Sequence, residues 1–154
     1  MPDLKYSESI LIRRAPEDVY EMVADVTRMG EWSPICTACW WDDGAGPSAG
    51  AWFTGRNEIP GRTWDTRSVV LTADPGREFT FAVGGSLVRW AYTLAPEDGG
   101  TRLTESWEFL RDGITLFEER FGAEAPAEIA SRTEAARRSI PETLKAIKRS
   151  AEDR

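Results

Sequence analysis

The chain has 154 residues, of which 41% are hydrophobic, and its formal net charge at neutral pH is −7. This length fits a single domain, expected to span residues 1–154, with enough apolar surface to bury a core. The acidic balance argues against nucleic acid as a partner, because phosphate binding needs a cationic face. The sequence contains no histidine, which excludes Ser-His-Asp and Cys-His catalytic systems and His-ligated metals.

Hydropathy gives a prediction about location. No stretch approaches the ~20 apolar residues that a membrane span needs. Residues 1–5 lack the charged and apolar regions of a secretory signal. We therefore expect a cytoplasmic protein without stable membrane insertion, and no pattern in the sequence indicates an oligomeric state.

The N-terminal part predicts one strand followed by two short helices. Residues 4–14 alternate loosely between apolar and polar and predict the strand. Pro16 and the two acidic residues behind it mark a helix start, since proline suits the first helical position and the helix dipole favours acids there. We expect Thr27 to cap the second helix, which Pro34 would end.

Between Ile35 and Phe109 the hydrophobic period becomes two residues. Glycine- and proline-rich turn signals divide this stretch at hairpin spacing. Six consecutive strands joined by short turns predict an antiparallel meander rather than a parallel sheet. After the strand that begins at Ile35, the expected strands cover 52–59, 63–73, 78–83, 86–95 and 101–109.

The period returns to 3.6 residues in the C-terminal part. A short helix is predicted over 114–121, followed by a long one from Pro126 with a single apolar stripe. Pro141 lies within this stripe, and a proline inside a helix costs ~3 kcal/mol and kinks it. Because Ser139 and Glu142 also fit a Ser-x-x-Glu capping box, we expect a kink or a one-residue break there.

The only two cysteines, Cys36 and Cys39, form a Cys-x-x-Cys motif. Such a motif can be half of a zinc site or a redox pair, but the remaining metal ligands are missing. The setting predicts a strand, in which a spacing of three puts the two side chains on opposite faces. We therefore expect two ordinary reduced cysteines, no metal and no cofactor.

Several short motifs, in order along the chain, point to a known family. They are Ala-Pro-Glu-Asp-Val-Tyr over 15–20, Gly-Glu-Trp-Ser-Pro over 30–34, Gly-Arg-Asn over 55–57, Trp-Asp-Thr-Arg over 64–67, Asp-Pro-Gly-Arg-Glu-Phe over 74–79 and Gly-Thr-Arg-Leu-Thr-Glu-Ser-Trp over 100–107. With the predicted element order, the sequence resembles the START-like, Bet v 1-like (SRPBCC) superfamily, and within it the bacterial polyketide cyclase/dehydrase and lipid-transport family. The resemblance implies an α+β helix-grip fold. In this fold a curved antiparallel sheet of about seven strands wraps around the long C-terminal helix, with two short helices after the first strand.

In that fold the concave face of the sheet and the long helix enclose a cavity. Every second residue of a strand points to the same face, so side-chain parity selects the residues that line it. A mostly apolar wall with a few polar groups is typical of small-molecule pockets, although aromatic side chains can also simply fill a core. The predicted lining is Trp32, Phe53, Asn57, Trp64, Thr66, Ser68, Phe81, Trp90, Tyr92, Glu105, Trp107, Phe109, Ile140 and Leu144.

Glu105 is the most informative polar residue of this lining. Inside an apolar chamber, desolvation would raise the pKa of Glu105 and make it a protonated donor or a general base near neutrality. Tyr92 is the second candidate for proton transfer. In the alternative interpretation, Glu105 pairs with an arginine such as Arg89 or meets water at the cavity mouth.

Three functions fit this sequence. The first is a carrier or sensor that binds a hydrophobic lipid- or polyketide-like molecule. The second is a cofactor-free cyclase, aromatase or dehydratase. The third is a protein-binding module, as in chaperone-regulating relatives of the fold, although the acidic surface shows no obvious exposed apolar stripe.

One departure from the family bears on the choice between binding and catalysis. Aromatic polyketide cyclases place an arginine on the cavity face of the fourth strand and a tyrosine near the second. The matching positions here are Ser68 and Cys39, while Arg67 has outward parity. This departure favours binding of a hydrophobic small molecule over catalysis.

Overall fold

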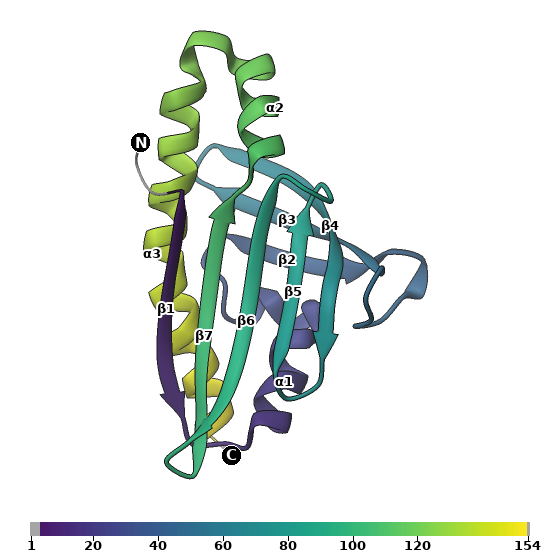
Figure 1. Ribbon diagram of the computed structural model, residues 1–154, viewed down its shortest axis with the longest axis vertical. Helices are drawn as coiled ribbons and strands as arrows, with labels where there is room; N and C mark the ends of the chain where they lie inside the picture. Colours follow the sequence, from purple (N-terminus) through teal and green to yellow (C-terminus); the bar gives the residue numbers. More distant parts are fainter. Residues whose placement is uncertain (1–3, 154) are drawn as a thin grey trace.

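A single antiparallel sheet with strand order β1-β7-β6-β5-β4-β3-β2 curves around one long helix (Figure 1). This computed structural model describes residues 4–153; residues 1–3, part of the N-terminal segment considered above, and residue 154 lie outside the described range. The strands are β1 (Lys5–Ile12), β2 (Cys36–Trp41), β3 (Trp52–Ile59), β4 (Arg62–Asp74), β5 (Glu78–Val83), β6 (Val88–Glu97) and β7 (Gly100–Phe109). The predicted α+β helix-grip fold is confirmed, since β2 to β7 form the expected meander and β1 pairs with β7.

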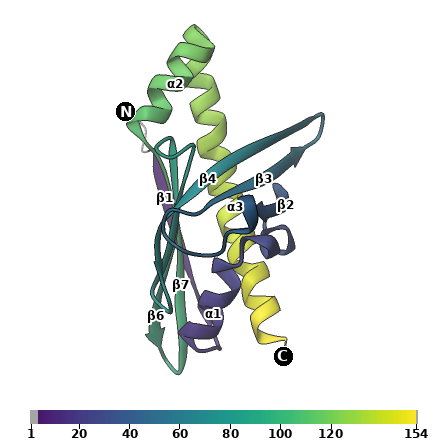
Figure 2. The same cartoon turned by 90° about the vertical axis from the view of Figure 1, so that its right-hand side faces the viewer.

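The helices follow the predicted order. They are α1 (Pro16–Ala24), the short 3-10 helices η1 (Val26–Glu31) and η2 (Asp42–Gly44), then α2 (Arg111–Phe121), the 3-10 turn η3 (Gly122–Glu124) and α3 (Ala125–Glu152). Figure 2 shows β3 and β4 leaving the plane of β1, β6 and β7, so that the sheet bends around α3. Within residues 4–153, no helix is both long and apolar enough to span a membrane.

The cap of η1 differs from the prediction. Asp25, not Thr27, is the N-cap residue, and its Oδ1 accepts a hydrogen bond from the Thr27 backbone N–H at 3.1 Å. Asparagine, aspartate and serine are somewhat better N-caps than threonine. The Asp25 carboxylate, two residues before Thr27, therefore caps the helix instead.

Of the kink or one-residue break expected at Pro141, the break is wrong, because α3 continues through this residue. Ser139 does not begin a new helix; its hydroxyl instead donates to the Ala136 carbonyl at 3.4 Å within the same helix. Ile140 and Leu144 flank the proline and are buried against the core. Each such side chain contributes about 1.5–3 kcal/mol when fully buried, which together offsets the ~3 kcal/mol that an internal proline costs.

Candidate functional site

The inner face of the sheet carries the residues that strand parity predicts. Along β7, Leu103, Glu105, Trp107 and Phe109 are buried, whereas the residues between them are half-buried. Most apolar inner residues of β3 to β6 also belong to the core or pack against it: Phe53, Val70, Phe79, Phe81, Val88, Trp90, Tyr92 and Leu94. Of the predicted lining, Trp32, Phe53, Ser68, Phe81, Tyr92, Glu105, Trp107, Phe109, Ile140 and Leu144 are buried, and Asn57, Trp64, Thr66 and Trp90 are half-buried.

Aromatic rings on this face pack closely against one another. The ring centroids of Phe53 and Phe81 are 5.0 Å apart in an edge-to-face arrangement. Phe109 meets Phe117 of α2 at the same distance of 5.0 Å. A ligand that enters between these rings must part them, because pairs at this distance are already in contact.

Two hollows in the surface are separate from this packed face. A hollow of about 440 Å³ is lined by polar and charged residues of the N-terminal helices and α3: Arg14, Asp18, Glu21, Met22, Asp25, Arg28 and Ser150. A smaller one of about 110 Å³ between β1 and α3 is lined by Glu8, Ser9, Ile10, Pro141, Leu144 and Lys145. Only Leu144 of the predicted lining reaches either hollow, so the candidate site is the inner face itself.

Glu105 and Tyr92 lie opposite each other on β7 and β6. Both are buried, with exposed fractions of 4% and 3%. Among the residues that the structure describes, no group makes a hydrogen bond to Oε1 of Glu105. The predicted alternative partner, Arg89, instead forms an ion pair with Glu108 at 2.7 Å on the other face of the sheet, so no Arg89 charge balances Glu105.

Burial controls the protonation of this pair. Desolvation raises the pKa of Glu105 to about 8, and the Tyr92 side chain opposite it opposes this rise only in part. Burial also raises the pKa of Tyr92 well above its ordinary value, with the Glu105 charge as the next cause. At neutral pH the Glu105 carboxyl is therefore mostly protonated, and it can donate a hydrogen bond to an acceptor or exchange a proton.

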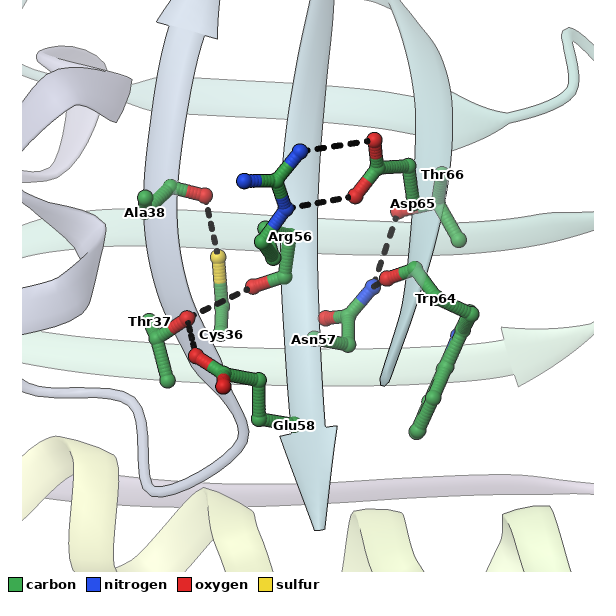
Figure 3. Close-up of polar contacts among 9 residues, drawn as sticks. All are labelled: Cys36, Thr37, Ala38, Arg56, Asn57, Glu58, Trp64, Asp65 and Thr66. Atoms are coloured by element: carbon green, nitrogen blue, oxygen red, sulfur yellow. Dashed lines mark hydrogen bonds and ion pairs between the residues drawn. The ribbon is translucent and has the colours of Figure 1, made fainter. Parts of the chain in front are cut away.

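The sequence-based placement of the two cysteines is wrong. Cys36 pairs with Asn57 of β3 and Cys39 pairs with Gly55, and the register shifts by one residue between Cys36 and Ala38. This β-bulge places two residues of β2 against one of β3, so the alternation of faces is reset. Both thiols therefore lie on the inner face, where Cys36 and Cys39 are buried and reduced. The Cys36 thiol donates a hydrogen bond to the Ala38 carbonyl at 3.4 Å (Figure 3).

Contacts on both sides hold the bulge in place. The Cys36 backbone N–H donates to the Ser33 hydroxyl at 2.9 Å, which fixes the start of β2. The Thr37 hydroxyl, in the bulge itself, bonds to the Glu58 carboxylate on the outer face (Figure 3). Gly30 of η1 lies so close that a Cβ there would be 2.6 Å from the Thr37 carbonyl oxygen, so only glycine fits at this position.

The sulfurs join a cluster of polar groups within the apolar face. A Cβ placed on Gly55 would lie 3.5 Å from Cys36 Sγ, 3.8 Å from Cys39 Sγ and 3.7 Å from Thr66 Oγ1. Tyr92 and Glu105, both buried, extend the polar groups of this face onto β6 and β7. We call Cys36, Cys39, Thr66, Tyr92 and Glu105 the inner polar cluster.

Asn57 borders this cluster and is held in a fixed orientation. Its Nδ2 donates to Thr66 Oγ1 at 3.3 Å and to the Trp64 carbonyl at 3.4 Å (Figure 3). Parity identified Asn57 and Thr66 correctly as inner residues. It missed both cysteines, because a bulge depends on the neighbouring strand and on η1 rather than on the spacing within β2.

Positive charge gathers at one border of the inner face. The Arg132 guanidinium of α3 lies 5.8 Å from the Trp64 ring and 5.5 Å from the Phe117 ring. Arg62 lies 5.1 Å from the same Trp64 ring. Burial lowers the pKa of Arg132, and the nearby Arg62 charge lowers it further. Its only ion pair within the described chain is a long one of 3.7 Å to Glu128, so this border favours an anionic group.

The structure does not gather metal ligands. Among residues 4–153, no group of three or more histidine, cysteine, aspartate or glutamate side chains is arranged to hold a metal ion. The chemistry available on the inner face is therefore hydrogen bonding, proton transfer by Glu105 and Tyr92, and thiol chemistry.

Comparison with known proteins places this site in a family context. Residues 3–152 match the sequence family described as "Polyketide cyclase / dehydrase and lipid transport". The solution structure of the Polyketide_cyc-like protein Cgl2372 from Corynebacterium glutamicum is 49% identical, with a TM-score of 0.72, over 99% of this chain and 94% of that one. No curated protein matches the chain.

More distant structures share the fold alone. The di-domain ARO/CYC StfQ from the steffimycin biosynthetic pathway is 15% identical with a TM-score of 0.72, over 97% of this chain and 51% of that chain. The crystal structure of Ara h 8.0201 is 16% identical with a TM-score of 0.64, over 97% of this chain and 98% of that one. At such identities the likeness extends to the arrangement of sheet and helix and not to individual side chains.

Proposed function

The chain belongs to the polyketide cyclase / dehydrase and lipid transport family, and from this premise we propose that it binds a hydrophobic lipid- or polyketide-like small molecule on the inner face of its sheet, as a cytoplasmic carrier or sensor. The observation that carries the proposal is the buried Glu105 carboxyl, whose Oε1 makes no hydrogen bond within residues 4–153. Most buried polar groups in folded proteins have a partner. A ligand with one polar group on an apolar body supplies that partner.

The protonation of Glu105 indicates which polar group the ligand carries. With a pKa of about 8, the carboxyl is mostly protonated at neutral pH and donates more readily than it accepts. A carbonyl or ether oxygen, or a neutral hydroxyl, is then the matching group deep in the site. The surrounding aromatic residues, including Trp107 and Phe81, provide apolar contact for the rest of the molecule.

Native mass spectrometry of freshly purified protein tests the proposal directly. We expect a co-purifying apolar molecule or, after its removal, stoichiometric binding of the neutral dye N-phenyl-1-naphthylamine or the anionic dye ANS. Trp90→Ala and Trp107→Ala should weaken dye binding more than Trp52→Ala. Trp52 lies on the outer face, where Arg67 stacks 4.8 Å from its ring. Equal effects of all three variants, at matched folded fractions, would contradict binding on the inner face.

A second candidate function is cyclisation or dehydration of a polyketide-like chain. The observation that favours it is a carboxyl whose pKa of about 8 lies near neutrality, next to a phenol, as proton transfer requires. In this case Glu105→Gln should lower turnover of a poly-β-ketone substrate by ~10²–10⁴ and leave its affinity within a few fold. If the protein is a carrier, the same variant should bind the ligand as well as the wild type or better. Tyr92→Phe separates the contributions of the two groups.

A further inference from the structure

We propose that Cys36 and Cys39 form a thiol–disulfide exchange site, in which a reversible intramolecular disulfide closes across the β2 bulge. Nothing in the ligand-binding proposal requires this site, and its formation requires no ligand. The two proposals can therefore fail independently. The inference rests on the position of the two sulfurs, which the structure places on one face of the same strand.

The bulge brings the two cysteines within reach of a disulfide. In a regular strand, residues three apart point to opposite faces and cannot be bridged. Here Cys36 and Cys39 pair with Asn57 and Gly55, which are two residues apart on β3. Two strand residues span about 6.6–6.8 Å, and disulfides join Cα atoms about 4.4–6.8 Å apart. The pair therefore lies at the upper limit of disulfide geometry, and a small contraction of the bulge closes the bond.

Gly55 leaves the space in which the bond forms. Both sulfurs lie within 3.8 Å of the point where a Cβ on Gly55 would stand. Because glycine has no side chain, the two thiols can approach each other over its Cα. Alanine at this position would place a methyl group in contact with both sulfurs without a backbone clash, since Gly55 is in an extended strand.

The thiols differ in reactivity in the direction that exchange needs. The neighbouring Cys39 thiol lowers the pKa of Cys36, whereas the Cys36 thiol and burial raise the pKa of Cys39. The Cys36 thiolate attacks one sulfur of a low-molecular-weight disulfide, forming a mixed disulfide and releasing one thiolate. Cys39 then loses its proton and attacks the Cys36 sulfur, which forms the intramolecular bond and releases the second thiol. Two protein thiols are oxidised and one small disulfide is reduced to two thiols.

The position of β2 gives reagents access to buried sulfurs. β2 is the last strand at one edge of the sheet, so only β3 pairs with its backbone. Edge elements open locally more easily than central strands. Exchange therefore proceeds at a rate set by the opening of β2, and a disulfide at the limit of its geometry is readily reduced again.

The test uses the purified full-length chain. The reduced protein is incubated with excess oxidised glutathione at neutral pH, quenched with acid, denatured, treated with N-ethylmaleimide and weighed by mass spectrometry. We expect a monomer that has lost two hydrogen atoms and takes no maleimide, and we expect dithiothreitol to restore both thiols. Two alkylated thiols, a stable glutathione adduct on one cysteine, or only disulfide-linked dimers would overturn the proposal.

A matched pair of glycine variants tests the geometry. Gly55→Ala should keep the fold and slow disulfide formation several-fold, because its methyl group contacts both sulfurs. Gly46→Ala is the control, since a Cβ there meets nothing within 4 Å, and it should oxidise at the wild-type rate. Equal rates for both variants would refute closure over Gly55. Phenylarsine oxide, which bridges two nearby thiols, should bind the folded wild type one-to-one, and a lack of binding would contradict the placement of both sulfurs on one face.

Discussion

β7 and β2 both contribute side chains to the inner face, but buried and exposed residues alternate differently along the two strands. In β7, burial alternates without interruption from Thr101 to Phe109. In β2, two neighbouring outward residues, Thr37 and Ala38, separate two inward cysteines. β7 is paired on both sides, by β1 and β6, whereas β2 pairs only with β3 and has η1 packed against it. Pairing on both sides does not by itself keep the period of two, since β4 lies between β3 and β5 and still shifts register between Val70 and Thr72. The bulge in β2 therefore depends on its specific contacts with β3 and η1.

The difference also separates two kinds of buried polar group. On β7, the regular alternation of faces places one ionisable group, Glu105, in an apolar environment. On β2, the bulge brings two thiols together that the chain spacing would separate. The properties of the Glu105 site depend on desolvation, and those of the cysteine pair depend on backbone geometry. Different substitutions should therefore disrupt the two sites.

The largest expected effect concerns the β7 site and is a pH dependence of stability. The pKa of Glu105 is about 8 in the folded protein and near its ordinary value, about 4.3, in the unfolded chain. Between these values the folded state binds more protons, so this group lowers stability progressively as the pH rises through this window. Glu105→Gln should therefore raise the free energy of unfolding by about 3–5 kcal/mol at about pH 9, with the gain disappearing towards about pH 5.

Urea unfolding of both proteins across this pH range measures the effect. Glu108→Gln is the matched control, because Glu108 lies on the same strand but pairs with Arg89 on the outer face. Its change should stay within about 1 kcal/mol, the usual range for exposed ion pairs. A Glu105→Gln curve parallel to that of the wild type would mean that Glu105 is solvated or paired, and Glu105 would lose its role in the site.

A smaller effect should follow from disturbing the β2 bulge. Gly30→Ala places a Cβ 2.6 Å from the Thr37 carbonyl oxygen, a backbone atom that cannot turn aside. The variant should lose about 1–3 kcal/mol of stability, as overpacked sites do, and should also shift the register at Cys36. Thermal unfolding gives the first value, and thiol alkylation rates of Cys36 and Cys39 report the second. Wild-type stability with unchanged alkylation would show that η1 and β2 are not in close contact.

The smallest effect is expected at the cationic border between the sheet and α3. Arg132→Gln should weaken binding of the anionic dye ANS several-fold at low salt and leave binding of the neutral N-phenyl-1-naphthylamine unchanged. Added salt should reduce the difference, since exposed charges are screened within about 10 Å at 0.1 M. Arg138→Gln, on the same helix with a side chain that is 78% exposed, is the control. An equal loss for both dyes would assign Arg132 a packing role instead.

The order of the elements and most of the inner face could be predicted from local sequence patterns. The periods of two and 3.6 residues, the turn residues and the family motifs predicted the meander and the long helix. Parity placed Glu105, Tyr92 and Asn57 correctly, because alternation in a strand depends only on chain neighbours as long as the register is regular.

Features that depend on contacts between residues distant in sequence could be seen only in the folded chain. The Pro141 position stays helical because its neighbours are buried against the sheet. Within residues 4–153 Glu105 has no arginine partner, because Arg89 faces outward and pairs with Glu108. Cys36 and Cys39 meet because β3 and η1 hold a bulge that the spacing within β2 does not encode. Burial, charge pairing and register each depend on the neighbouring element. The hydrophobic period within one segment does not identify that element, so the sequence pattern could not predict them.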